Sequence, residues 1–175
     1  MEGKGEAINR FLVENFNTIL RWEEKTLSAY HDGRLSVNEF HILETVFAAM
    51  ADNQNTIGEI ARRTGVTTGT LTTSVKTLEG KGYLRREKGE EDRRVVWLMP
   101  TAMAQDANYY HKLFHKRMVT AVMDSLDVRQ LDTLIATLDI LAQHFHQLER
   151  NTGQVNPLRE EAEPTQAFDE AEQEF

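Results

Sequence analysis

The sequence predicts a mainly α-helical fold with one small β-hairpin, because three patterns recur along its 175 residues. Apolar residues spaced three and four apart indicate several amphipathic helices. Ser or Thr followed three positions later by Glu marks helix N-termini. Two short strand-like runs flank one charged turn, Lys88-Gly89-Glu90-Glu91-Asp92, which indicates a hairpin. The order of these elements decides the fold class.

The first half of the chain predicts four helices. We expect them over residues 8–30, 36–50, 57–64 and 67–80. Ser36 with Glu39, and Thr56 with Glu59, form capping boxes that begin the second and third helices. Gly65 ends the third helix. The fourth helix carries Leu71, Val75 and Leu78 on one side, and its opposite face is polar.

The second half predicts a hairpin and two long helices. We expect strands at 83–87 and 94–99 and helices at 101–124 and 128–150, the last opened by a capping box of Asp127 and Gln130. Residues 151–175 hold seven acidic residues and one basic residue, which predicts a disordered acidic tail. Two short helices joined by a Gly turn and followed by a charged hairpin define a winged helix-turn-helix, here with long N- and C-terminal helices.

Charge is distributed unevenly along the chain. The formal net charge is −8, yet residues 56–94 hold nine basic and six acidic residues and form the one basic segment. A basic helix-turn-helix segment favours duplex DNA as the partner. The absence of Cys excludes disulfides and thiol catalysis. Since no apolar run is long enough for a membrane span and the first residues are polar, we expect a cytoplasmic protein with no membrane partner.

The fourth predicted helix has the composition of a DNA recognition helix. Hydroxyl groups can bond base edges or phosphates, and a glycine lets the backbone approach the duplex. The residues predicted to contact DNA are Thr67, Thr68, Gly69, Thr70, Thr72, Thr73, Ser74 and Lys76. The alternative is that these hydroxyls only cap and decorate a solvated helix. Thr disfavours helix interiors, so this many of them would be a poor choice for helix stability alone.

The predicted hairpin carries cations near its tip. They are Arg85, Arg86, Lys88, Arg93 and Arg94, of which Lys88, Arg93 and Arg94 are predicted to contact DNA. Such a wing can place an Arg in the minor groove. Asp92 is expected to pair with an Arg and fix the loop. The alternative is a surface hairpin whose mixed charge serves solubility, and three Glu residues in the hairpin favour that alternative.

Several motifs resemble the MarR family of bacterial winged-helix regulators over residues 8–150. They are Glu59-Ile60-Ala61, Val66-Thr67, Leu78-Glu79, Lys81-Gly82-Tyr83-Leu84 and Asp92-Arg93-Arg94. Within that family, Gly69 to Ser74, Asp92 to Val96, Phe40-His41 and His111 to Met118 resemble the FabT-type repressors of fatty-acid synthesis. One departure is Pro100-Thr101-Ala102-Met103-Ala104, which stands where the family usually has Leu-Thr followed two residues later by Gly.

The resemblance implies a domain at 1–150 in which 56–99 bind DNA and 8–30 and 101–150 form a homodimer. It also implies repression at a palindromic operator, with a long-chain acyl group delivered on acyl carrier protein as corepressor. Dimerisation follows independently, because a small winged core cannot bury such long apolar stripes. A two-fold dimer would place its recognition helices about 34 Å apart, one turn of B-DNA.

An effector pocket is expected where the second helix meets the dimer helices. Its candidate lining is Trp22, Phe40, His41, Phe47, Tyr110, Phe114 and Met118. The alternative is that these side chains are ordinary core, since aromatic and Met residues at helical spacing usually are. The choice of a pocket for an acyl chain follows from the resemblance alone.

Three histidines raise a metal hypothesis. His111 and His115 lie four apart on one helix face, so with His41 they could bind one Zn²⁺, as in a zinc-responsive repressor. We expect no metal, because the absence of Cys and the FabT-like context favour a solvated or hydrogen-bonded His pair. A winged-helix protein-interaction module that does not bind DNA is another alternative. No phosphate loop or nucleophile motif is present, so we expect no catalytic residues and no enzyme.

Overall fold

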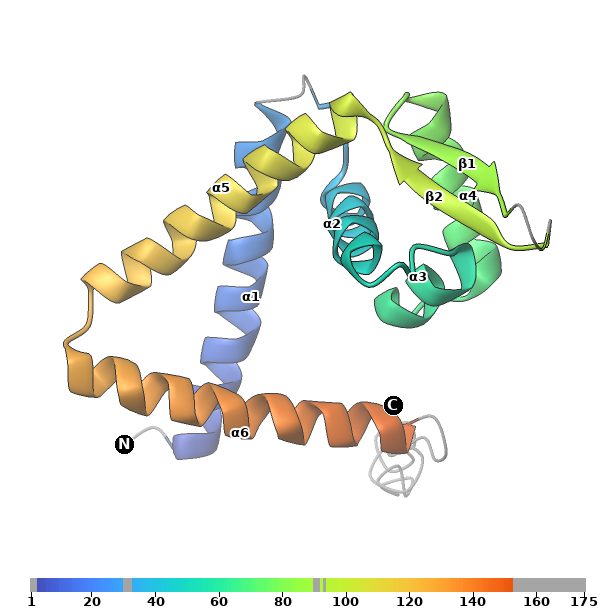
Figure 1. The fold of residues 1–175 in the computed structure, drawn as a ribbon. Helices are drawn as coiled ribbons and strands as arrows, with labels where there is room; N and C mark the ends of the chain where they lie inside the picture. The colour runs from blue at the N-terminus through green and yellow to red at the C-terminus, as the bar shows by residue number, and fades with distance from the viewer. Residues whose placement is uncertain (1–2, 30–32, 90–91, 93, 153–175) are drawn as a thin grey trace, which may run out of the picture. The chain divides into compact units, whose positions relative to one another are not determined.

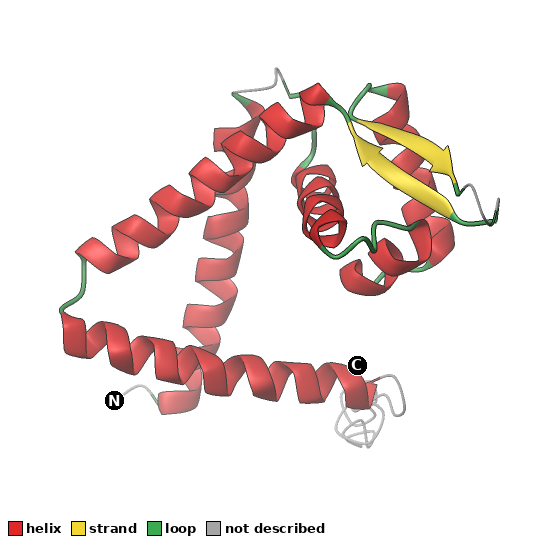
Figure 2. Ribbon diagram, in the orientation of Figure 1, coloured by secondary structure: helices red, strands yellow, loops and turns green. Residues whose placement is uncertain are grey.

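The computed structural model describes residues 3–29, 33–89, 92 and 94–152, and these residues form a mainly helical chain with one hairpin (Figures 1 and 2). The elements are α1 (Lys4–Ser28), α2 (Val37–Ala51), α3 (Ile57–Thr64), α4 (Thr68–Gly80), β1 (Leu84–Lys88), β2 (Val96–Pro100), α5 (Ala102–Asp124) and α6 (Val128–Thr152). The predicted fold class is therefore confirmed.

The predicted helix caps account for the starts of three helices. Ser36 Oγ accepts from the Glu39 N–H, and the Glu39 carboxylate accepts from the Ser36 N–H, which completes a capping box at α2. Asp127 and Gln130 form the same reciprocal pair at α6. At α3, Thr56 accepts from the Glu59 N–H. Satisfying the free N–H groups of the first turn fixes where each helix begins.

Several predicted boundaries differ from the structure by a few residues. α1 begins at Lys4, directly after the extended residue Gly3, rather than at residue 8, and it ends at Ser28. α6 continues through Thr152, so its last turn enters the segment predicted as tail. The predicted tail from 153 to 175 lies outside the described residues. The capping box predicted at α3 is only half present, because the Glu59 carboxylate accepts from Arg62 and Arg63 instead.

The winged core is built from α2, α3, α4 and the hairpin. Its fully buried apolar side chains come from all four elements and include Leu43, Val46, Ile60, Leu71, Val75, Leu78, Tyr83, Leu84 and Leu98. Gly65 ends α3 at φ 67°, a left-handed conformation that glycine adopts without strain, and lets the chain turn directly into α4. The predicted helix-turn-helix is thus present.

The hairpin is antiparallel and is anchored to the loop before α3. Arg86 lies opposite Leu98 in its register. The buried Asn55 donates from Nδ2 to the Leu98 carbonyl at 2.8 Å, and the Leu98 N–H donates to the Asn55 carbonyl at 2.9 Å. Since both bonds are shielded from water, they fix the strand relative to α3. The wing therefore has a rigid base.

The departure from the family pattern lies at the junction into α5. Thr101 donates from its hydroxyl to the Gly82 carbonyl at 2.8 Å, and its N–H donates to the Tyr83 carbonyl at 3.0 Å. The same hydroxyl accepts from the Ala104 N–H, and Ala104 is fully buried. The junction is therefore held by Thr101 and needs no glycine at position 104.

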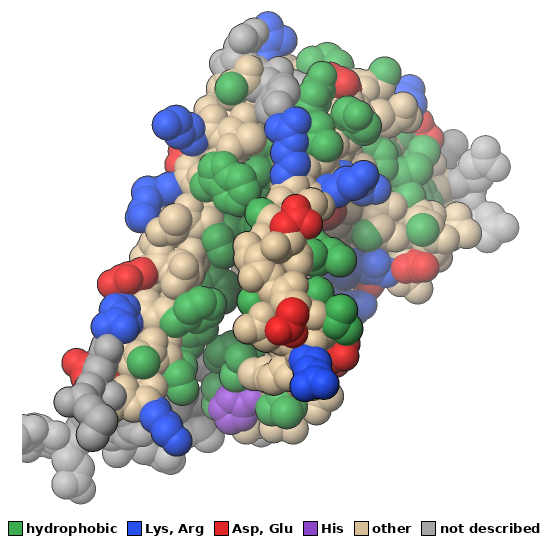
Figure 3. All heavy atoms as spheres, turned by 90° about the vertical axis from the view of Figure 1, so that its left-hand side faces the viewer, with side chains coloured by type: hydrophobic (Ala, Val, Ile, Leu, Met, Phe, Trp, Pro, Cys, Tyr) green, Lys and Arg blue, Asp and Glu red, His purple; other side chains and the backbone are tan. Residues whose placement is uncertain are grey.

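The chain divides into two compact units, Met1–Thr120 and Ala121–Phe175, so the boundary falls inside α5. Long apolar stripes are exposed in each unit, and Figure 3 shows hydrophobic side chains at the surface of one face. In α1 they include Ile8, Phe11, Phe16 and Leu20, and in α6 Ile135, Leu138, Leu141, Phe145 and Leu148. Among the described helices, none is long and apolar enough to cross a membrane.

Candidate nucleic-acid interface

The helix α4 has one buried face and one exposed face. Leu71, Val75 and Leu78 have no exposed surface. All the residues predicted to contact DNA on this helix lie on or beside the other face, with Thr72 and Ser74 half-buried and the rest exposed. The apolar spacing anchors the helix by one side only, so its hydroxyl-rich side is presented to solvent.

Thr67 fixes the first turn of α4. Its hydroxyl oxygen accepts from the Thr70 N–H at 3.1 Å and lies 2.9 Å from the Thr70 hydroxyl. The N–H groups of a helix N-terminus and the positive end of its dipole attract phosphate. Thr67, Thr68 and Gly69 therefore present an anion-attracting helix end directly after the Gly65 turn.

The remaining hydroxyls of α4 are held by the helix itself. The hydroxyls of Thr72, Thr73 and Ser74 donate to the carbonyls four residues earlier, at 2.7, 3.3 and 3.4 Å. A hydroxyl that donates in this way keeps lone pairs for a further bond, and it can rotate toward another acceptor. These side chains are ordered but remain available to a base edge or a phosphate.

The wing presents Lys88 and Arg94 to solvent, as predicted. Asp92 Oδ1 accepts from the Arg94 backbone N–H at 2.8 Å, which fixes the loop locally, and its expected pairing with an Arg side chain stays a prediction. This short-range bond is cheap in entropy because only two residues separate its partners. Arg93 lies outside the described residues.

The other two wing arginines, which were predicted only to add positive charge near the tip, lie beside acidic side chains. Arg86 turns toward α4, where its Nε lies 2.8 Å from Glu79 Oε2 and its Nη2 donates to the Thr72 carbonyl at 3.3 Å. Arg85 lies 3.6 Å from Glu87. Arg86 therefore ties β1 to α4, an interaction that no local sequence pattern indicated.

A groove of about 420 Å³ lies between α3, α4 and β2. It is lined by Thr56, Ile57, Gly58, Thr68, Thr72, Arg94, Val95 and Val96. Arg94 thus faces the same space as the hydroxyls of α4 and the N-terminus of α3. A cation, free helix N–H groups and hydroxyls in one groove match the chemistry of a phosphate backbone.

The cations of α3 contribute less to this surface than their number suggests. Glu59 accepts from both Arg62 and Arg63, and Arg63 also contacts Asp52 at 3.2 Å. The hydrogen bonds from Arg62 and Arg63 lower the pKa of Glu59 to about 2. Because these charges are already paired with acidic side chains, the exposed cations near the groove are those of α4 and the wing.

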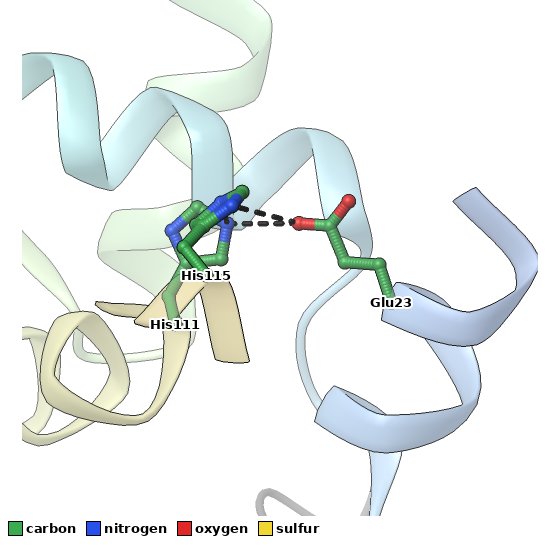
Figure 4. A group of neighbouring side chains, drawn as sticks. All are labelled: Glu23, His111 and His115. Carbon is green, nitrogen blue, oxygen red and sulfur yellow. Dashed lines mark hydrogen bonds and ion pairs between the residues drawn. The ribbon is translucent and has the colours of Figure 1, made fainter. Parts of the chain in front are cut away.

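A second polar cluster lies where α1, α2 and α5 meet (Figure 4). Glu23 Oε1 lies 2.8 Å from His111 Nε2 and 3.2 Å from His41 Nε2, and the Nε2 atoms of His111 and His115 lie 3.0 Å apart. We call these four residues the Glu23–His cluster. Burial lowers the pKa of His111, although its hydrogen bond with Glu23 opposes the shift. The three predicted histidines are brought together.

Sequence reasoning missed Glu23, the residue that joins the histidines. It interrupts the apolar stripe of α1, four residues after Ile19 and four before Leu27, and its side chain is 3% exposed. An acidic residue in the middle of an apolar stripe is the signal that would have identified it. Glu44, also missed, places Oε2 3.6 Å from His111 Nδ1.

The residues predicted to line an effector pocket occupy several environments. Trp22 contacts Phe114 edge-on at 4.8 Å between ring centroids, and Phe40 stacks on His111 at 5.7 Å. Phe114 and Phe40 are buried, whereas Trp22 is 43% exposed. Phe47, Tyr110 and Met118 are half-buried, and Tyr110 contacts Tyr109. Trp22, Phe40, His41 and Phe114 therefore share the junction of α1, α2 and α5, and the pocket stays a prediction.

An exposed hydroxyl-rich helix beside an anchored basic wing defines a winged helix-turn-helix regulator of the DNA-binding class. Comparison with known proteins gives the family: the MarR family model matches residues 35–96. The structure of Streptococcus pneumoniae FabT in complex with DNA is 32% identical and has a TM-score of 0.77, covering 83% of this chain and 99% of that one. This chain belongs to the MarR family of DNA-binding transcription regulators, and it is not an enzyme.

Other relatives agree in fold. The S. aureus MepR–DNA complex has a TM-score of 0.67 at 15% identity, covering 78% of this chain and 96% of that one. A mutant of E. coli MarR in complex with operator DNA has a TM-score of 0.61 at 20% identity, covering 77% of this chain and 93% of that one. The uncharacterized HTH-type regulator YcgE of Bacillus subtilis (strain 168) is 47% identical over 45 residues, 26% of this chain and 29% of YcgE.

Proposed function

We propose that this MarR-family regulator is a homodimeric repressor of fatty-acid biosynthesis genes that binds a pseudo-palindromic operator with a long-chain acyl group, delivered on acyl carrier protein, as corepressor. The observation that carries the proposal is the 32% identity to Streptococcus pneumoniae FabT in an alignment that covers 83% of this chain. DNA contact by α4, Lys88 and Arg94 belongs to the same proposal.

The exposed apolar stripes support a homodimer. Large apolar side chains at solvent positions on α1 and α6 lower the free energy of association when a second copy covers them. A two-fold arrangement would present two copies of α4 to successive major grooves, about 34 Å apart. Sedimentation equilibrium of the full chain should therefore give a dimer at micromolar concentration.

The effector would act through the junction of α1, α2 and α5. Trp22 is the most exposed of the candidate pocket residues that meet there, and Phe114 lies behind it. An acyl chain inserted beside these rings would join α1 to α5 and favour one dimer geometry. It can raise operator affinity only to the extent that it binds that geometry more tightly than the alternative.

Fluorescence anisotropy tests the proposal with three labelled duplexes: the protein's own upstream region, a fatty-acid-synthesis promoter and a scrambled duplex of equal length. We expect tighter binding to the first two, increased by long-chain acyl carrier protein and unchanged by carrier protein without an acyl group. Equal affinity for all three duplexes would refute sequence-specific repression. Specific binding that ignores the acylated carrier would refute the corepressor.

Charge reversal in the wing separates this proposal from a protein-interaction module. Arg94→Glu places an anion in the groove beside Thr68 and Thr72, where phosphate is expected. We expect loss of operator binding at physiological salt, with an unchanged circular dichroism spectrum. Lys112→Glu, an exposed change on α5, is the matched control and should bind normally. Unchanged operator binding by Arg94→Glu would favour a module that does not use DNA.

A further inference from the structure

Arg86 contacts the helix α4 at two places from the strand β1. Its Nε atom lies 2.8 Å from Glu79 Oε2, and its Nη2 atom donates to the Thr72 carbonyl at 3.3 Å. Thr72 and Glu79 are seven positions apart, which is about two turns of an α-helix, so they lie on the same side of α4. A single guanidinium group therefore holds two turns of α4 against the hairpin, a role that suits its planar set of donors.

The side of α4 that Arg86 holds also lines the groove beside the wing. Thr72 lines that groove together with Thr68, one turn earlier, and Arg94 faces it from the wing. The apolar face of α4 is buried in the core, but burial of apolar surface has no preferred direction and does not by itself fix the rotation of a helix about its axis. Arg86 adds a directional contact at the side of α4 that borders the groove.

The hairpin is also fixed on its other side. Arg86 lies opposite Leu98 in the register of the two strands. Leu98 in turn exchanges two hydrogen bonds with Asn55, in the loop before α3. A continuous series of contacts thus runs from this loop through both strands to Thr72 of α4. Because the series holds the hairpin from both sides, it keeps the wing and α4 in one arrangement around the groove.

The exposure of the Arg86 contacts favours a role in positioning over a role in stability. The side chains of Arg86 and Glu79 are each 30% exposed, and pairs that water screens to this extent add little to the free energy of unfolding. Both contacts of Arg86 are made with α4 and its Nε atom is buried, whereas Lys88 and Arg94 are exposed at the wing. Arg86 is therefore placed to orient α4.

From this geometry we propose that Arg86 is a positioning residue that determines how strongly the protein distinguishes its operator from other duplexes. Attraction to phosphates depends on the number of nearby cations and tolerates a small rotation of α4. Hydrogen bonds to base edges require donor–acceptor distances of about 2.7 to 3.2 Å and are lost when the helix shifts. Loss of the Arg86 contacts therefore weakens specific binding more than non-specific binding. This inference rests on operator recognition in the proposed function, and it does not depend on the fatty-acid role.

Fluorescence anisotropy with two duplexes tests the inference: a sequence that the parent protein selects from a random pool, and a scrambled duplex of equal length. We expect Arg86→Gln to lower the ratio of the two affinities about 10-fold, an effect of the size of one mismatched base pair. Arg85→Gln is the matched control, since it removes the same charge from the same strand and its partner is Glu87 of the hairpin. It should keep the parental ratio. An unchanged ratio in Arg86→Gln, or equal falls in both variants, would overturn the inference.

A second variant separates positioning from direct contact with DNA. Glu79→Gln removes the carboxylate partner but leaves the cation of Arg86 in place, and Glu79 is exposed enough for the variant to fold. We expect the affinity ratio to fall in the same direction, by less than in Arg86→Gln because the bond to the Thr72 carbonyl remains. A ratio at or above that of the parent protein in Glu79→Gln would show that Arg86 is not needed to hold α4.

The salt dependence of binding gives an independent measurement. A positioning residue makes no phosphate contact, so the slope of log affinity against log salt should be the same in Arg86→Gln and Arg85→Gln. A slope that falls by about one unit in Arg86→Gln alone would identify Arg86 as a phosphate contact and overturn the positioning role. If the parent protein selects no sequence from the pool, operator recognition in the proposed function fails as well. If the parent selects a sequence and Arg86→Gln discriminates equally well, only this inference fails.

Discussion

The exposed face of α4 and the Glu23–His cluster are both groups of polar side chains within one unit of the chain, but their polar atoms find partners in opposite ways. On α4 the hydroxyls of Thr72, Thr73 and Ser74 bond to carbonyls four residues away in the same helix. In the cluster, Glu23 and His111 are partners 88 positions apart, and both are buried. The hydrogen bonds of the α4 hydroxyls are local and exposed to solvent, whereas those of the cluster join distant parts of the chain and are buried.

This difference in exposure decides which of the two groups can contact a large partner. An exposed hydroxyl can exchange its local bond for one to a large partner at little cost, which suits a DNA duplex. The buried side chains of the cluster bond to one another and are closed to a large partner. The two groups also differ in how much they contribute to the free energy of unfolding, and substitutions can measure that difference.

The largest effect is expected from the buried face of α4. Leu78→Ala removes a fully buried side chain from the winged core and should lower the free energy of unfolding by about 2 to 5 kcal/mol. Thr77→Ala, one position away on the exposed face, should change it by less than about 0.5 kcal/mol. Urea denaturation of both variants measures these changes in the free energy of unfolding. Similar changes for the two variants would contradict a helix with one buried and one exposed face.

Removal of Glu23 should have the next largest effect. In chelator-treated buffer, Glu23→Ala leaves His41 and His111 without their shared acceptor, which costs about 1 to 3 kcal/mol because His111 is buried. Glu24→Ala, an exposed neighbour on α1, is the control and should be nearly neutral. Thermal and urea unfolding give the values. If Glu23→Ala unfolds with the same free energy as the parent protein, the hydrogen bonds to Glu23 do not stabilise the fold.

The exposed face should respond in DNA binding rather than in stability. Lys76→Ala removes an exposed cation from α4, so the slope of log affinity against log salt should fall by about one unit if it contacts a phosphate. Unfolding should be unaffected. Lys116→Ala on α5 should keep the parental slope. Identical slopes for Lys76→Ala and the parent protein would exclude this phosphate contact.

The smallest effect is expected from the ion pair of Glu39 and Lys81, whose exposure lies between that of the α4 hydroxyls and that of the buried cluster. Burial raises the pKa of Glu39, but hydrogen bonds from Lys81 and Ser36 outweigh it and lower the pKa below 4.5. The pair therefore stabilises the fold above pH 4.5, and this contribution disappears as the pH falls through the lowered value. Lys81→Met should cost less than about 1 kcal/mol at pH 7, since Lys81 is partly exposed.

Acid titration of that variant checks the sign. The difference in unfolding free energy between Lys81→Met and the parent should shrink as the pH falls below 4.5, because Glu39 is then protonated in both proteins. A difference that grows toward acid would contradict the lowered pKa.

The sequence by itself determined the order of elements, the caps at Ser36 and Asp127, the turn at Gly65 and the two faces of α4. Each of these depends on interactions that reach no more than about four residues along the chain, so a pattern of residue types is enough to reveal them. The exposed hydroxyls followed in turn, because burying Leu71, Val75 and Leu78 leaves their opposite face to solvent.

Only the tertiary structure decided which distant side chains meet. It directed Arg86 toward Glu79, occupied the arginines of α3 with Glu59, and joined Glu23 to the histidines of α2 and α5. These contacts depend on how helices pack, and packing is set by the summed shape of many apolar side chains rather than by any local spacing. The sequence therefore revealed the exposed hydroxyl-rich face of α4, whereas the buried cluster emerged only once three helices had been brought together.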